Sequence, residues 1–130
     1  MDNSSTGKSA LGMEGNITAL LGYIINIVAL ISVFIEKDNK FVRFHALQSV
    51  FWSLGLLVLL IATIFIGMIL TFVLGYISST LGGLVFGLTM LLYVGLFIVF
   101  FGGAIYAAIQ AYGGKSFKFP IIGNLAEKYT

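Results

Sequence analysis

Two apolar runs, separated by a short polar segment, dominate the chain. The first covers 17–35, and the second extends from Phe44 to Gly114 without a single Lys, Arg, Asp or Glu. Within the second run, turn-forming residues cluster only at 78–83, where Ser-Ser-Thr-Leu-Gly-Gly interrupts the apolar pattern. The pattern therefore predicts three helices, over 17–35, 45–77 and 84–112.

The length and composition of these helices indicate a membrane protein. A helix over 17–35 would be about 28 Å long, close to the roughly 30 Å thickness of a hydrocarbon core. The chain is 59% hydrophobic and 9% charged, whereas soluble domains carry about 25% charged residues. A charge at the bilayer centre costs about 2.5 to 3.5 kcal/mol on insertion scales, which accounts for the long uncharged run. We expect an all-α integral membrane protein that crosses the plasma membrane several times.

The distribution of basic residues predicts the orientation. Three Lys or Arg residues lie in the loop 36–43 and three in the tail after Tyr112, whereas the N-terminal segment has Lys8 alone. Because positive residues collect on the cytoplasmic side, both basic segments are predicted to be cytoplasmic, and the run between them crosses an even number of times. The simplest solution has three transmembrane helices, with the N-terminus outside and the C-terminus cytoplasmic; four helices are the alternative.

This topology divides the chain into three parts. Residues 1–15 are predicted to be a flexible polar N-terminus, 16–112 a transmembrane helical domain, and 113–130 an interfacial cytoplasmic tail. In the tail, Phe117 and Phe119 alternate with lysines, a pattern typical of segments that dip into the interface beside anionic headgroups. Docking of the tail on a partner is the alternative.

Small residues recur at helical spacing and predict close helix packing, because they let two helix backbones approach in a membrane. The predicted packing positions are Ala19, Gly22, Asn26, Ala29, Gly83, Gly87, Gly103 and Ala107, with a further ridge at Gly67, Thr71 and Gly75. The Asn26 side chain would add a hydrogen bond across such a contact, or would contact a ligand. Three helices offer few internal surfaces, so several ridges also favour a homo-oligomer or a partner within a membrane complex.

Several classes of function lack the residues that they need. One histidine and no cysteine are too few ligands for a metal site. The predicted spans contain none of the Asp, Glu, Lys or Arg residues that transporters and proton pumps use. Nucleic-acid binding would need a basic stripe, which is also missing. We therefore expect no enzyme, no cofactor and no nucleic-acid partner.

Two motifs lie at the predicted cytoplasmic helix ends. The first reads Phe-Val-Arg-Phe-His-Ala-Leu-Gln at 41–48, where His45 and Gln48 share one helix face. The second runs from Gln110 through Gly-Lys to Phe-Lys-Phe-Pro at 117–120. Together they resemble a widespread family of small bacterial and archaeal membrane proteins of unknown function, which is similar to the Tic20 component of the chloroplast inner-envelope import machinery. The resemblance implies a membrane-embedded subunit, with protein translocation as one expectation.

The two motifs define a candidate interaction or lipid-binding face. Its residues are Arg43, His45, Gln48, Gln110, Lys115 and Lys118. We expect this face to bind anionic lipid headgroups or an acidic partner segment. His45 is predicted either to cap its helix at the interface or to contact Gln110 or the tail. The function expected is a non-enzymatic membrane subunit that self-associates or supports a larger assembly; the alternative is a pore or carrier for a small solute or ion.

Overall fold

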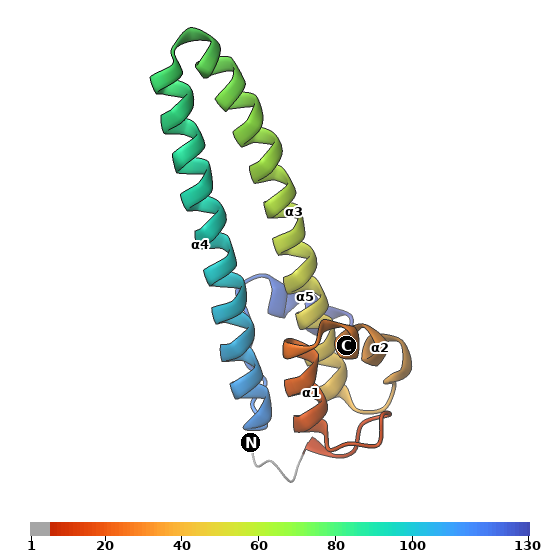
Figure 1. Cartoon of the computed structure of the whole chain (residues 1–130). Coiled ribbons are helices and arrows are strands. Elements are labelled where there is room, and N and C mark those ends of the chain that lie inside the picture. The colour runs from red at the N-terminus through yellow and green to blue at the C-terminus, as the bar shows by residue number, and fades with distance from the viewer. Residues whose placement is uncertain (1–5) are drawn as a thin grey trace. The chain divides into compact units, whose positions relative to one another are not determined.

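The computed structural model describes residues 6–130, which form five helices joined by short loops. They are α1 (Gly15–Ile24), α2 (Asn26–Ile35), α3 (Lys40–Ile77), α4 (Ser79–Tyr112) and α5 (Ile122–Lys128) (Figure 1). The chain forms two compact units. The terminal unit contains the residues up to Ser53 together with Gly102–Thr130, and the hairpin unit is Leu54–Phe101. The all-helical class is confirmed, and α3 and α4 are each long and apolar enough to cross a bilayer.

In the hairpin unit, α3 and α4 run antiparallel and touch where small residues face each other (Figure 1). A Cβ added at Gly67 would collide with the Thr89 side chain, and one added at Gly82 would lie 2.6 Å from Cα of Gly75. Glycine at these positions therefore permits the close helix contact. The large apolar side chains point outward instead; Phe72 is 73% exposed. This arrangement suits a unit whose surface is covered by lipid tails.

Side-chain caps explain why both long helices begin earlier than predicted. Oδ1 of Asn39 accepts a hydrogen bond from the backbone N–H of Val42 (3.2 Å), so α3 begins at Lys40 and not near 45. The predicted loop over 78–83 is reduced to Ser78. Its hydroxyl accepts a hydrogen bond from the backbone N–H of Leu81 (3.4 Å), and α4 begins directly after it.

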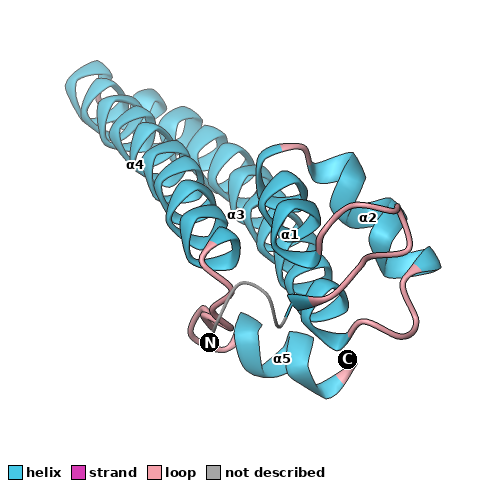
Figure 2. Cartoon of the chain, turned by 90° about the horizontal axis from the view of Figure 1, so that it is seen from below, coloured by secondary structure: helices cyan, strands magenta, loops and turns pink. Residues whose placement is uncertain are grey.

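The helix predicted over 17–35 is not continuous in the structure. It consists of two ten-residue helices, α1 and α2, separated at Ile25, whose backbone is extended (φ −115°, ψ 93°). The two helices fold back on each other (Figure 2). Gly22 allows this, because a Cβ at Gly22 would lie only 3.3 Å from Cβ of Ala29. Each helix is about 15 Å long, half the roughly 30 Å thickness of the hydrocarbon core, so neither can cross it alone.

The N-terminal residues lie beside the loop between α2 and α3. Nδ2 of Asn39 donates hydrogen bonds to the backbone carbonyls of Thr6 (2.6 Å) and Lys8 (3.1 Å). The backbone N–H of Ala10 donates to the carboxylate of Glu36 (2.6 Å). The predicted three-span topology puts these two segments on opposite sides of the membrane, whereas in the structure they are hydrogen-bonded to each other.

The predicted flexible N-terminus has a defined backbone path where the structure describes it. Residues 1–5 of that segment lie outside the described part of the chain. From Thr6 onward the backbone is ordered by its own hydrogen bonds, such as those from the N–H of Gly15 to the Gly7 carbonyl (2.7 Å) and from the N–H of Ser9 to the Met13 carbonyl (2.8 Å). These bonds fix the direction in which the chain enters α1.

The tail after α4 packs within the terminal unit through Phe119, one of the two aromatic residues that the sequence predicted to dip into the membrane interface. Phe119 is 6% exposed and stacks on Trp52, with ring centroids 4.1 Å apart and an interplanar angle of 6°. The same indole covers Gly103, where a Cβ would lie 2.6 Å from the ring. Phe119 packs in a core made mainly of small side chains, including the fully buried Ala107 and Ala111. Small side chains let α1, α4 and the tail approach closely here.

Candidate functional site

Three polar side chains from α1 and α3 meet inside the terminal unit. Tyr23, His45 and Gln48 are 5%, 1% and 0% exposed, and we call them the polar cluster. Nε2 of Gln48 donates a hydrogen bond to the Tyr23 hydroxyl (2.7 Å), which lies 2.8 Å from Nδ1 of His45. His45 and Gln48 are three residues apart on α3 and share one face, as the sequence predicted. Tyr23, one residue before the end of α1, contacts both of them from that helix.

The polar cluster binds the backbone of the segment that follows α4. Nε2 of Gln48 also donates to the carbonyl of Phe117 (2.9 Å), and Oε1 of Gln48 accepts from the N–H of Phe119 (3.0 Å). Nε2 of His45 lies 3.0 Å from the carbonyl of Lys115. An unpaired buried backbone group costs about 1 to 3 kcal/mol. These bonds therefore explain why an extended segment without regular structure stays in place.

The hydrogen bonds assign one tautomer to His45. The Lys115 carbonyl can only accept, so Nε2 of His45 carries a proton. Nδ1 then accepts from the Tyr23 hydroxyl, whose oxygen in turn accepts from Gln48. Each member of the cluster is bonded to another member or to the backbone. The arrangement holds α1, α3 and the tail together.

Hydroxyl groups one turn further along α3 support the break between α1 and α2. Oγ of Ser49 donates a hydrogen bond to the carbonyl of Gly22 (2.8 Å). The side-chain amide of Asn26 donates to the hydroxyls of Ser49 (3.4 Å) and Ser53. Asn26 therefore makes the contact between helices that was one of its two predicted roles.

Arg43 closes the C-terminal end of α2. Its Nη1 donates hydrogen bonds to the carbonyls of Val33 (3.0 Å) and Glu36 (2.9 Å). The last carbonyls of a helix lack partners within the helix and carry partial negative charge, which a guanidinium group neutralises. The half-buried Arg43 thus stabilises the fold and is not an open cation of the predicted binding face.

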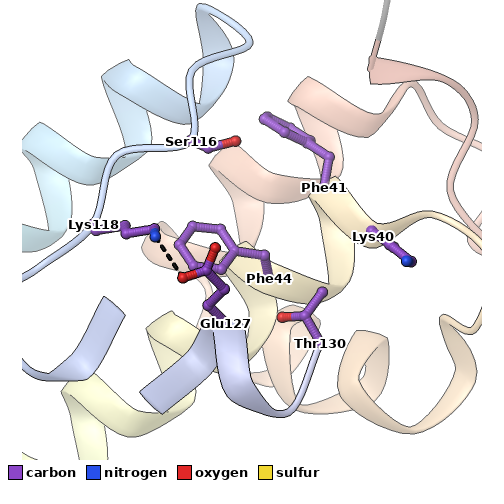
Figure 3. Close-up of a pocket in the computed structure, with 7 residues that line it drawn as sticks. All are labelled: Lys40, Phe41, Phe44, Ser116, Lys118, Glu127 and Thr130. Atoms are coloured by element: carbon purple, nitrogen blue, oxygen red, sulfur yellow. Dashed lines mark hydrogen bonds and ion pairs between the residues drawn. The ribbon is translucent and has the colours of Figure 1, made fainter. Parts of the chain in front are cut away.

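Exposed cations of the terminal unit border a pocket of about 430 Å³ (Figure 3). Its lining residues are Lys40, Phe41, Phe44, Ser116, Lys118, Glu127 and Thr130. Lys118 and Glu127 form an ion pair, with the ring of Phe44 beside it, whereas the ammonium group of Lys40 points away from Lys118. The pocket therefore places Lys118, paired with Glu127, beside the aromatic ring of Phe44.

The predicted binding face therefore separates into buried and exposed residues. His45 and Gln48 lie in the interior, and only Lys115 and Lys118 of the six are exposed. His45 contacts the tail at Lys115, which was one predicted role, and not Gln110. Gln110 is half-buried, and its backbone carbonyl accepts a hydrogen bond from the N–H of Lys115 (3.0 Å).

Sequence reasoning missed three residues that organise the terminal unit, namely Tyr23, Glu36 and Asn39. The capping role of Asn39 could have been predicted from the sequence, because Asn is a favoured residue directly before the first turn of a helix. Glu36 is 3% exposed, and its carboxylate accepts the N–H groups of Ala10 (2.6 Å) and Asn39 (3.2 Å). The role of Tyr23 carried no local signal, since its partners lie more than 20 residues away in the sequence.

Comparison with known proteins places this architecture in a family. A model of the magnetosome magnetite crystal formation protein family matches residues 9–126. The chain belongs to this family. The match includes the polar cluster and both motifs, and no solved structure matches the chain. The similarity to Tic20 that the motifs suggested is not shown by these matches.

Curated relatives are archaeal UPF0132 membrane proteins. One from Methanocaldococcus jannaschii is 36% identical over 125 residues, which covers 95% of this chain and 96% of the relative. A second from the same organism is 33% identical over 123 residues, or 92% of this chain and 73% of the relative. One from Archaeoglobus fulgidus is 32% identical over 117 residues, which covers 89% of this chain and 95% of the relative. These names, together with two helices able to cross a bilayer, support the membrane location.

Proposed function

We propose that this protein is a small non-enzymatic membrane subunit that self-associates through the outward face of α4. The observation that carries the proposal is the open surface at Gly83 and Gly87. Both are exposed, and an added Cβ at either position would have no described atom within 4 Å beyond its chain neighbours and the nearby backbone of its own helix. By contrast, Gly67 and Gly82 already face the partner helix of the hairpin. Glycines four residues apart let a second helix backbone approach closely in a membrane.

The polar groups of the hairpin unit favour a subunit over a pore or carrier, the second candidate. The hydroxyl of Thr63 donates a hydrogen bond to the Leu59 carbonyl (2.7 Å), and that of Thr89 donates to the Val85 carbonyl (2.8 Å). These hydroxyls are bonded within their own helices. A path for a polar solute would need a continuous stripe of polar groups directed away from the helix backbone.

Charge supports an orientation with the terminal unit at the cytoplasmic face. All seven Lys and Arg residues of the chain lie in this unit, and the hairpin unit has none. Because basic residues collect on the cytoplasmic side, we infer that α3 and α4 cross the plasma membrane as a pair and return the chain to the cytoplasm. Exposed lysines at the pocket would then face the anionic lipids of that leaflet.

The family description refers to magnetite crystal formation, and the resemblance of the motifs refers to protein import. A self-associating subunit is compatible with either. Among the described residues, no group of three or more His, Cys, Asp or Glu side chains could hold a metal ion. The proposed role rests on the open surface of α4 at Gly83 and Gly87.

The test is Gly87→Leu in liposomes, with self-association measured by energy transfer between two labelled populations at a series of protein-to-lipid ratios. Added bulk at Gly87 should weaken association at least about tenfold, equivalent to about 1.4 kcal/mol. Gly95→Leu is the matched control, because Gly95 is also open but lies about 100° around α4 from the Gly83–Gly87 face. Equal association of Gly87→Leu and the unmodified protein would refute this interface.

A further inference from the structure

The helix α2 carries an apolar stripe that no described residue covers. Its residues are Ile27, Leu30, Ile31, Phe34 and Ile35, which are 63%, 45%, 43%, 73% and 42% exposed. Their spacing places them on one face of the helix. The buried side of α2 holds Ala29 and Ser32. This helix therefore turns its apolar face outward and its small and polar residues inward, the reverse of a surface helix in a soluble domain.

The apolar surface continues over the break between α1 and α2. Ile24 and Ile25 are 62% and 47% exposed. The side chain of Asn26 ties the break to Ser53 of α3, and Ser53 is followed directly by Leu54, where the uncharged hairpin unit begins. The tip of the α1–α2 pair is thus its most apolar part.

The two ends of the α1–α2 pair are polar and lie together. Before α1, the N–H of Ala10 bonds to the Glu36 carboxylate, which follows α2 (2.6 Å). The charged residues Lys37 and Asp38 come next in the chain. A polar base and an apolar tip on helices of about 15 Å each make a pair that is too short to cross the hydrocarbon core, which is roughly 30 Å thick.

Several backbone groups at the tip are hydrogen-bonded, as a membrane location requires of irregular backbone. The N–H of Ile25 donates to the Leu21 carbonyl (2.6 Å), and the Ile25 carbonyl accepts from the N–H of Val28 (2.9 Å). The Gly22 carbonyl accepts from the Ser49 hydroxyl (2.8 Å). Irregular backbone is tolerated at membrane depth only where such groups are satisfied, and these three bonds pair both backbone groups of Ile25 and the Gly22 carbonyl.

We propose that α1 and α2 form a re-entrant hairpin, which enters one leaflet of the bilayer and returns to the same face without crossing. The occupant of the apolar stripe is lipid acyl chain. The stripe is aliphatic apart from Phe34 and contains none of the Trp, Tyr and Arg residues that anchor protein interfaces. The N-terminal segment, the loop after α2 and the tail then share one side of the membrane, and only the tip of α3 and α4 reaches the other.

Sidedness tests the re-entrant path, and the absence of native cysteines makes each introduced thiol unique. The exposed positions Ala10, Asp38, Thr80 and Ser116 are replaced singly by cysteine and treated with an impermeant maleimide, before and after permeabilisation of the cells. Ala10→Cys, Asp38→Cys and Ser116→Cys should react from the same side, and Thr80→Cys from the other. Reaction of Ala10→Cys from the same side as Thr80→Cys would restore a spanning first segment and overturn the proposal.

Lipid contact is tested with a fluorescent label on Ile27→Cys and Phe34→Cys in liposomes that contain lipids brominated along the acyl chain. Both labels should be quenched at least about twofold more than a label on Lys37→Cys, the exposed polar control just after α2. Equal quenching at all three positions would mean that protein or water covers the stripe. Neither readout depends on self-association, so a failure of the Gly87→Leu test leaves this proposal standing, and the reverse also holds.

Discussion

Replacing Gln48 by methionine should release the segment after α4 from the terminal unit. The Gln48 side chain is fully buried and bonds to the Tyr23 hydroxyl, the Phe117 carbonyl and the Phe119 N–H. Methionine is similar in length and volume but has no N–H donor and only a weak acceptor. Gln48→Met therefore removes these bonds while it preserves most of the apolar contacts.

The magnitude follows from the groups that lose a partner. The N–H of Phe119 is buried, and leaving it unpaired costs about 1 to 3 kcal/mol. Phe117 is half-buried, so its carbonyl loses less, and the Tyr23 hydroxyl keeps its bond to His45. A total of about 2 to 4 kcal/mol corresponds to a roughly 30- to 900-fold change in the opening equilibrium of the tail.

Hydrogen exchange of the Phe119 amide in nanodiscs, followed by NMR, measures that equilibrium directly. In Gln48→Met the Phe119 amide should exchange faster by about one and a half to three orders of magnitude, as the loss of about 2 to 4 kcal/mol implies. The matched control is Gln110→Met. Gln110 is half-buried, and its side chain makes no hydrogen bond in the described part of the chain, so exchange should rise less than about threefold. Unchanged Phe119 exchange in Gln48→Met, or equal effects of the two variants, would refute the reasoning.

Two further predictions concern the tail. Ile121 has φ 67° and ψ −56°, is 81% exposed, and is spanned by a hydrogen bond from the N–H of Ile122 to the Pro120 carbonyl (2.7 Å). Because glycine adopts a positive φ without steric cost, Ile121→Gly should raise the free energy of unfolding by about 1 kcal/mol. A lower thermal midpoint in detergent would contradict this. Short-chain phosphatidylglycerol added in neutral detergent should raise the thermal midpoint, and Lys118→Gln should reduce that rise because about 1 kcal/mol of lipid attraction is lost. Lys128→Gln, an exposed cation outside the pocket, is the control, and equal losses from both variants would exclude a specific pocket.

The sequence by itself determined the class of this protein and part of its site. The absence of Lys, Arg, Asp and Glu from Phe44 to Gly114 indicates that lipid surrounds this part of the chain. This inference needs no tertiary structure, because a charge in lipid is costly whatever the details of packing. The shared face of His45 and Gln48 was also readable, since residues three apart on a helix are neighbours in any fold. The close contact at Gly67 agrees with the same local spacing, whereas a Cβ at Gly75 would lie an ordinary 3.7 Å from Cα of Gly82.

Tertiary structure decided the break at Ile25 and everything that depends on it. Hydrophobic periodicity cannot distinguish one nineteen-residue helix from two short ones, because a single extended residue changes the path of the chain without changing its composition. The break is supported by contacts of Gly22 with Ala29 and of Asn26 with α3, which exist only once the helices are packed. Hydropathy therefore predicted a crossing where the structure has a hairpin.

The polar cluster was decided at the same level. Gln48 binds the backbone of residues about 70 positions later in the chain, and backbone groups carry no sequence signature. For the same reason the sequence could not tell that Arg43 bonds to the end of α2 while Lys118 stays exposed. A local pattern reports which residues share a face or tolerate lipid, but the partner of a buried polar group is chosen by segments that only the fold brings together.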